Sequence, residues 1–277
     1  KRLKQFGIPY ASSTTHSASH AGYYPDALPL TLKLTFDPAS GKLYGGQCVG
    51  YDGADKRIDQ IALLIKQGGT VYDLIKVEHA YAPPFSSAKD PIAIAGYVAG
   101  NIISGAMPVA TWRQMAEADR CDTLFLDVRT REEHAFGAIP GSVNIPLDEL
   151  RGRIGELPRD KEIYIYCAVG LRGYLALKIL TGHGFTRVKN LSGGYKTYAT
   201  ATAPIENKTA TIRTNGKTDT QHTGERIKTL KIDACGLQCP GPVMKIKQAI
   251  DSIGEGERIE MVATDAGFSR DAQAWCN

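Results

Sequence analysis

The apolar run IYIYC, residues 163–167, limits more than any other feature how this chain can fold. A helical pattern, LRGYLALKILTGHG, begins four residues after its cysteine, and a similar apolar run, DTLFLDVR, precedes it. Continuous apolar runs are typical of parallel strands covered on both faces, and parallel strands need helical crossovers between them. Residues 108–200 are therefore predicted to form an α/β region with a parallel sheet.

Cys167 is predicted to lie at the carboxyl edge of this sheet, where open α/β folds bind their ligands. A helix N-terminus and a nearby guanidinium, here Arg172, favour the thiolate form of a cysteine. The backbone amides between these two residues can also point at the sulfur or at a bound anion. The four residues that supply them are Ala168, Val169, Gly170 and Leu171. A buried core thiol is the structural alternative.

Four residues separate Cys167 from Arg172, whereas phosphotyrosine-type phosphatases place five between their cysteine and arginine. This spacing resembles the rhodanese family, as do LDVRTREEHAFGAIPGSVNIP (126–146) and NLSGGY (190–195). The resemblance implies that Cys167 takes a sulfur atom from a donor such as thiosulfate, polysulfide or coenzyme A persulfide and passes it to a thiol. Arg172 and the loop amides would stabilise the anionic donor.

Two other functions are alternatives to sulfur transfer, and several other residues are expected to have structural roles. Asp127 and Arg129 are expected to brace the loop rather than to react. The module is alternatively a docking domain without catalysis, or, on the third interpretation, a cysteine-dependent phosphatase. Cys48 and Cys121, in apolar surroundings, are interpreted as structural, as is Cys276 near the end of the chain.

Residues 229–277 predict a β-α-β-α unit in which Cys239 directly precedes a proline in CPGP. Proline favours the first turn of a helix, so this thiol is also expected at a helix N-terminus. The motif resembles the TusA/SirA-like sulfur carriers, here truncated, and this resemblance implies that Cys239 carries a persulfide. A relay of sulfur from Cys167 to Cys239 is a further hypothesis. Cys235 is a possible resolving thiol; a disulfide or half of a zinc site are alternatives, and we expect no metal. The Thr-rich residues 201–228 predict a flexible linker.

Residues 1–107 predict a small α+β domain, because LPLTLKLTFD alternates apolar and polar residues and helical patterns follow. HAGYYPDALPLTLKLTFD, GGQCVGYDGADKRID and AYAPPFSSAKDPIAIAGYVAGNI resemble the dimerisation domain of the flavin-dependent pyridine nucleotide-disulfide reductases, in the coenzyme A-disulfide and polysulfide/persulfide reductase group. The resemblance implies a homodimer through residues 1–107. It also places three tyrosines near the reacting sulfur of the reductase site: Tyr23, Tyr24 and Tyr81.

The whole sequence of 277 residues thus predicts a multidomain protein, part α+β and part α/β. We expect the C-terminal piece of a longer enzyme, because the chain starts at Lys1 and stops inside a helical pattern. This chain alone should bind no cofactor, while the parent would use FAD, NAD(P)H and coenzyme A. Six scattered cysteines predict a reducing, cytoplasmic setting. A net charge of +4 and the lack of a long apolar run predict no nucleic-acid or membrane partner.

Overall fold

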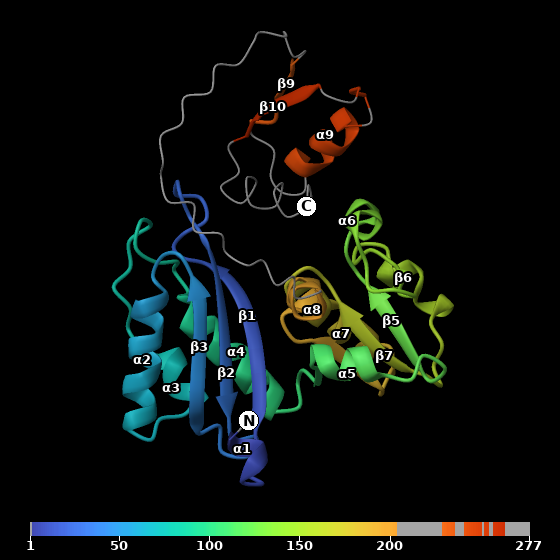
Figure 1. Ribbon diagram of the computed structural model, residues 1–277. Coiled ribbons are helices and arrows are strands. Elements are labelled where there is room, and N and C mark those ends of the chain that lie inside the picture. The colour runs from blue at the N-terminus through green and yellow to red at the C-terminus, as the bar shows by residue number, and fades with distance from the viewer. Residues whose placement is uncertain (1, 204–228, 236–240, 251, 255–256, 264–277) are drawn as a thin grey trace. The chain divides into compact units, whose positions relative to one another are not determined.

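The computed structural model describes residues 2–203, 229–235, 241–250, 252–254 and 257–263. The chain divides into two compact units, Lys1–Thr202 and Ala203–Asn277. The first unit contains an antiparallel region and a parallel-sheet region, which are labelled by element in Figure 1. The two units are described separately below. Among the described residues, no helix combines the length and apolar character that crossing a membrane requires.

The antiparallel region is built on a three-stranded sheet in which β2 lies between β1 and β3. Its strands are β1 (Ala11–Ala18), β2 (Pro29–Phe36) and β3 (Leu43–Gly50). The apolar residues of β2 are almost wholly buried, as the alternating pattern predicts. β1 was not predicted, because SSTTHS lacks an apolar alternation; its buried side chains are the small polar Ser13 and Thr15.

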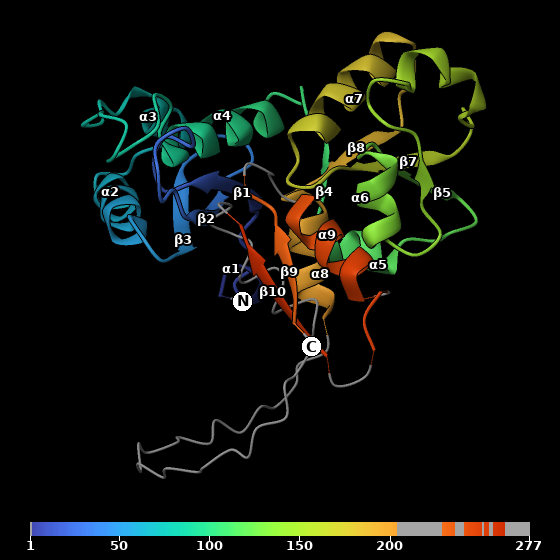
Figure 2. The ribbon, with the colours of Figure 1, turned by 90° about the horizontal axis from the view of Figure 1, so that it is seen from above.

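Helices cover this sheet and complete its core (Figure 2). A short helix α1 (Arg2–Gln5) precedes β1, and three longer ones follow β3: α2 (Ala54–Lys66), α3 (Val71–Lys76) and α4 (Pro91–Ile103). Helix α4 begins where the sequence directs it to begin. Asp90 accepts a hydrogen bond from the backbone N–H of Ile92, and Pro91 occupies the first turn.

The parallel-sheet region has five strands in the order β4-β8-β7-β5-β6, and every neighbouring pair is parallel. The strands are β4 (Val109–Ala110), β5 (Thr123–Asp127), β6 (Val143–Asn144), β7 (Glu162–Tyr166) and β8 (Val188–Leu191). The central strand β7 sends Ile163 and Ile165 into one core and Tyr164 and Tyr166 into another. Burial on both faces explains the continuous apolar run and confirms the predicted parallel sheet.

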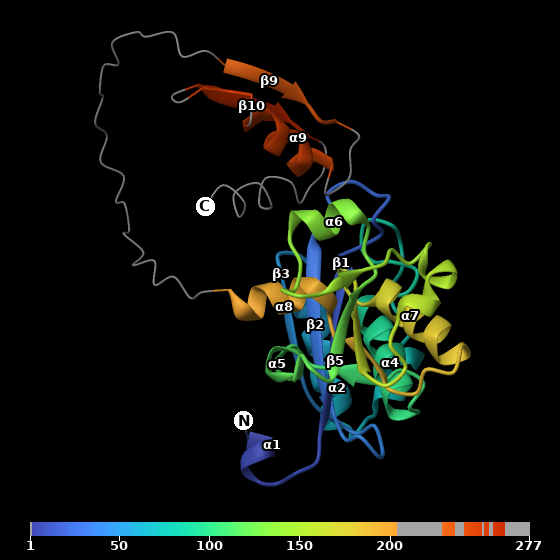
Figure 3. The ribbon, with the colours of Figure 1, turned by 90° about the vertical axis from the view of Figure 1, so that its right-hand side faces the viewer.

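Helices alternate with these strands and connect them. They are α5 (Trp112–Glu117), α6 (Arg131–Phe136), α7 (Leu171–Gly182) and α8 (Gly194–Thr202), with 3-10 turns η1 (Leu150–Gly152) and η2 (Ile154–Glu156). Helix α6 follows the carboxyl end of β5 (Figure 3), and its capping box joins Thr130 and Glu133. Helix α8 runs to Thr202, two residues into the segment for which a linker was predicted.

The two regions of the first unit share packing. Val98 and Ile102, on the last turns of α4, contact the core cluster that contains Ile163 and Cys167. Met107 is buried in the same cluster. The antiparallel region therefore helps to form the core beneath the predicted reactive loop.

The second unit has a parallel pair, β9 (Thr229–Asp233) and β10 (Arg258–Val262), with α9 (Gly241–Ile250) between them in sequence. This agrees with the predicted β-α-β order. The predicted second helix falls within residues 264–277, which lie outside the described residues, as do residues 204–228 of the predicted linker.

Candidate active site

Cys167 lies directly after the central strand β7 and before the N-terminus of α7. The backbone N–H of Gly170, which is the N-cap residue of α7, donates a hydrogen bond to Cys167 Sγ over 3.1 Å. Cys167 is 1% exposed, while Val169 and Leu171 form an exposed apolar rim around the loop. The sulfur is therefore buried beneath a short loop. It accepts a hydrogen bond from Gly170, one of the four residues whose backbone amides the sequence analysis expects to point at the sulfur.

Backbone amides in the first turn of helix α8 donate hydrogen bonds to the Cys167 loop. The N–H of Tyr195 donates to the carbonyl oxygen of Cys167 over 2.8 Å, and the N–H of Lys196 donates to that of Ala168 over 3.0 Å. Gly194 begins this helix with φ +61°, and a Cβ added there would lie 2.6 Å from the Cys167 oxygen. Gly194, the second glycine of NLSGGY, must therefore be glycine, because the backbone of the Cys167 loop occupies the space of a side chain.

Asn190, on β8, fixes the other end of the loop. Its Nδ2 donates to the carbonyl oxygen of Gly170 over 3.0 Å. A Cβ added at Gly173 would collide with the Asn190 side chain, so the small residue lets the first turn of α7 approach β8. Sequence reasoning assigned no role to Asn190; its place in NLSGGY was the available signal.

Arg172 is held by Glu133, a residue that sequence reasoning missed. Each of two guanidinium nitrogens lies 2.7 Å from a Glu133 carboxylate oxygen, and the hydrogen bonds to Glu133 raise the pKa of Arg172. Burial would raise the pKa of Glu133, but hydrogen bonds from Arg172 and the Thr130 N–H outweigh it and lower that pKa. Arg172 thus stands beside the loop as predicted, but its charge is shared with a carboxylate. The acidic third residue of the α6 capping box was the signal.

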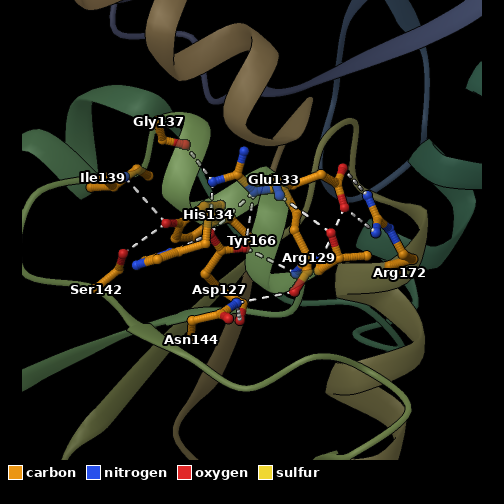
Figure 4. A network of polar contacts seen from close by, with 11 residues as sticks. Asp127, Arg129, Glu133, His134, Gly137, Ile139, Ser142, Asn144, Tyr166 and Arg172 are labelled. Atoms are coloured by element: carbon orange, nitrogen blue, oxygen red, sulfur yellow. Dashed lines mark hydrogen bonds and ion pairs between the residues drawn. The ribbon is translucent and has the colours of Figure 1, made fainter. Parts of the chain in front are cut away.

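A buried ion pair between Asp127 and Arg129 lies at the end of β5, and a hydrogen bond from His134 connects it to helix α6 (Figure 4). The Asp127 carboxylate accepts hydrogen bonds from the Arg129 guanidinium and from His134 Nδ1. Burial would raise the pKa of Asp127, but these hydrogen bonds outweigh it and hold the pKa below its ordinary value. The Arg129 guanidinium also donates to the Gly137 carbonyl and lies 4.2 Å from the centre of the Tyr195 ring. The geometry is that of a brace between loop segments.

Tyr166 and Asn144 extend this network (Figure 4). The Tyr166 hydroxyl accepts the Ile139 N–H and hydrogen-bonds Ser142 Oγ, and burial raises the pKa of Tyr166 to about 12. Asn144 Nδ2 donates to the carbonyl oxygens of Asp127 and Arg129. These polar groups satisfy one another, so they stabilise the strand ends around the loop.

Two of the three predicted tyrosines come together. The hydroxyls of Tyr23 and Tyr81 lie 3.2 Å apart on exposed loops, and this hydrogen bond raises the pKa of Tyr23. Tyr24 instead contacts His20 edge to face. The two hydroxyl groups of Tyr23 and Tyr81 therefore lie together on the exposed surface of the antiparallel region.

The remaining cysteines differ in their surroundings. Cys235 is exposed after β9, and its hydrogen bond to Asp233 raises its pKa. Cys48 is half-buried on β3, and burial raises its pKa. The prediction for Cys121 was wrong: it is exposed in the turn before β5, so the apolar run begins after it. Cys239 and Cys276 lie outside the described residues.

Within the ranges that the structure describes, no three His, Cys, Asp or Glu side chains gather as metal ligands would.

Three domain families match separate parts of the chain. Residues 1–91 match the dimerisation domain of pyridine nucleotide-disulphide oxidoreductases, residues 108–201 the rhodanese-like domain, and residues 230–277 the sulfurtransferase TusA. The coenzyme A disulfide reductase of Staphylococcus epidermidis is 44% identical over 97 residues, which are 35% of this chain and 22% of that protein. That of Staphylococcus aureus is 40% identical over the same length. The chain thus spans about a fifth of these curated relatives.

Two solved structures match both regions of the first unit. Reduced Bacillus anthracis CoADR-RHD is 48% identical with a TM-score of 0.70, over 72% of this chain and 36% of that one. An NAD-dependent persulfide reductase from A. fulgidus is 38% identical with a TM-score of 0.62, over 69% of this chain and 34% of that one. The predicted resemblance is confirmed: the chain joins a pyridine nucleotide-disulphide oxidoreductase dimerisation domain, a rhodanese-like domain and a TusA domain.

Proposed function

We propose that this chain transfers sulfane sulfur through a persulfide on Cys167. The observation that carries the proposal is the hydrogen bond from Gly170 N–H to Cys167 Sγ, in a four-residue loop that ends at Arg172. An amide at a helix N-terminus stabilises negative charge on sulfur. The rhodanese-like match over this loop supports the same chemistry.

The reaction proceeds in two balanced displacements. The Cys167 thiolate attacks the outer sulfur of thiosulfate, a sulfur–sulfur bond forms at Sγ, and the sulfur–sulfur bond of thiosulfate breaks to release sulfite. An acceptor thiolate then attacks the terminal sulfur of the Cys167 persulfide, which regenerates the Cys167 thiolate and leaves the acceptor as a persulfide. The Gly170 amide stabilises the sulfur, and Arg172 attracts the anionic donor.

We further propose that the chain belongs to a disulfide or persulfide reductase that uses FAD and NAD(P)H and acts on coenzyme A disulfide, polysulfide or persulfide. The dimerisation-domain match and the names of the relatives support this setting. In it, the flavin would supply electrons. This chain would contribute the Tyr23 and Tyr81 hydroxyls, which already face each other at 3.2 Å, to the binding of a sulfur substrate.

The same region would form a homodimer through residues 1–107. The match of residues 1–91 to a dimerisation domain supports this part of the proposal. A relay from Cys167 to Cys239 is proposed from the TusA match and the CPGP motif alone.

A docking module without catalysis is the second candidate, and the burial of Cys167 favours it, since an attacking sulfur must be reached by its donor. Steady-state transfer of sulfur from thiosulfate to cyanide distinguishes the two. The proposal expects turnover that the Cys167→Ser variant abolishes and the Cys121→Ser variant, which changes an exposed cysteine, retains. Absence of turnover in the unaltered chain would favour docking.

A further inference from the structure

The antiparallel region touches the turn that supports the Cys167 loop. Strand β1 is an edge strand, and the N–H of Thr14 on its free edge donates to Ser192 Oγ over 2.9 Å. Edge strands leave such groups without a partner unless another segment covers them. Ser192 belongs to NLSGGY, so the edge of one sheet is covered by the turn that leads into α8.

His16 makes a second contact two residues further along β1. Its Nδ1 lies 2.9 Å from Thr31 Oγ1 on β2, and its Nε2 lies 2.8 Å from Thr197 Oγ1 on α8. Burial, and then the positive charge of Lys196, lowers the pKa of His16 to about 4. The ring is therefore neutral near pH 7 and holds one hydrogen bond at each nitrogen, between a sheet and a helix.

The helix that His16 contacts is the helix that holds the loop. Tyr195 and Lys196, immediately before Thr197, donate their amides to the carbonyls of Cys167 and Ala168. One helical turn thus carries the histidine contact and both loop contacts. A shift of this turn moves the carbonyl that belongs to Cys167 itself.

Two adjacent glycines leave little room at either junction. A Cβ on Gly193 would collide with the Thr197 hydroxyl and lie 3.0 Å from Thr14 Cγ2. A Cβ on Gly194 would lie 2.7 Å from the Ala168 carbonyl carbon. Close packing on both sides transmits a displacement of β1 to the loop instead of absorbing it.

We propose that His16 is a positioning residue for sulfur transfer: through Thr197 it sets the place of α8 and, with it, the backbone of the Cys167 loop. The dimerisation region thereby controls the geometry of the rhodanese-like site. This inference rests on the proposed sulfur transfer, but its test has a readout that does not need the reaction.

The test uses matched variants of the full chain. His16→Gln keeps an amide nitrogen near the place of Nε2 and so keeps a donor for Thr197, whereas His16→Asn reaches only the place of Nδ1. Thr197→Val removes the hydroxyl at nearly constant shape, and Thr197→Ser restores it. Thr200→Val is the control, because the Thr200 hydroxyl donates a hydrogen bond to the Lys196 carbonyl on its own helix.

Hydrogen–deuterium exchange of peptides covering residues 167–172 and 193–198 reads the loop directly. The proposal expects exchange about threefold to tenfold faster in His16→Asn and Thr197→Val, the range for loss of one hydrogen bond. It expects rates near those of the unaltered chain in His16→Gln, Thr197→Ser and Thr200→Val. Equal exchange in all five variants would overturn the proposal, even if one of them were less stable.

Thiosulfate kinetics supply the second arm. His16→Asn and Thr197→Val should raise KM for thiosulfate with less effect on kcat, because the loop that receives the anion is displaced while the thiol is unchanged. The conservative variants should restore KM. If the unaltered chain does not turn over thiosulfate, the proposed function fails, and the exchange experiment still decides the role of His16.

Discussion

Glu133 and Arg172 face each other in a two-point ion pair, with both nitrogen–oxygen distances at 2.7 Å. Glu133 comes from α6 and Arg172 from α7, so the pair ties the segment after β5 to the Cys167 loop. It also neutralises part of the charge that an anionic sulfur donor would meet.

Replacing Glu133 by Gln should therefore lower KM for thiosulfate about twofold to fivefold, because the guanidinium loses a competing carboxylate. The same change should cost about 1 kcal/mol in the free energy of unfolding. Arg172→Gln should instead raise KM. Steady-state kinetics and urea denaturation measure both effects. An increase of KM in both variants would show that Glu133 is needed mainly to orient Arg172.

Asp127 should make the free energy of unfolding depend on pH in the acid range. Its pKa is lower in the folded chain than in the unfolded one, so its stabilisation is fully present above the ordinary carboxyl pKa and is lost as pH falls through the lower folded value. At pH 7, Asp127→Asn should cost about 3–5 kcal/mol, because it leaves the buried Arg129 without its partner. Urea denaturation at a series of pH values should show the difference shrinking toward acid. A constant difference would contradict this assignment.

His16 should add a second pH dependence in a milder range. Its folded pKa is about 4, below the ordinary 6.5, so the unfolded chain binds more protons between these values and stability falls as pH is lowered from 6.5 toward 4. Lys196 is the charged group beside the ring, and Thr31 and Thr197 contribute only hydroxyls. His16→Gln should lack this loss, which is on the order of a few kcal/mol. Parallel pH profiles for the two proteins would rule out a buried neutral His16.

Gly194→Ala should disable the loop. The residue has φ +61°, and the new Cβ would meet the Cys167 carbonyl oxygen at 2.6 Å. We expect at least about 1 kcal/mol of lost stability from the left-handed backbone alone, together with loss of sulfur loading on Cys167. Gly155→Ala, which has open space around its Cβ, is the matched control. Thermal unfolding and thiosulfate turnover distinguish them, and a fully active Gly194→Ala would contradict the described support of the loop.

The sequence pattern predicted those strands that are stabilised by their own apolar side chains. The alternation of Leu30, Leu32 and Leu34 predicted β2, and the apolar run before Cys167 predicted β7. β1 escaped prediction because it is an edge strand stabilised by partners rather than by apolar side chains. Its His16 and Thr14 contact residues nearly two hundred positions away.

The site shows the same division. The cysteine, the loop and the arginine were readable because they are adjacent in sequence. Glu133 and Asn190 were not predicted, because each contacts the loop only in the folded chain. Glu133 lies 39 residues from Arg172 in the sequence, and Asn190 lies 20 residues from Gly170. Cys121 was misjudged because an apolar run begins shortly after it, at Leu124, whereas Cys121 itself lies in the turn before that strand.

The most direct test of sulfur transfer is peptide mass spectrometry of the purified chain after exposure to thiosulfate. The account predicts one added sulfur atom on Cys167 in the unaltered chain and in Cys121→Ser, and none in Cys167→Ser. A further adduct on Cys239 that disappears in Cys167→Ser would extend the account to a relay. An unmodified Cys167 in a folded chain whose thiol still reacts with iodoacetamide would contradict it.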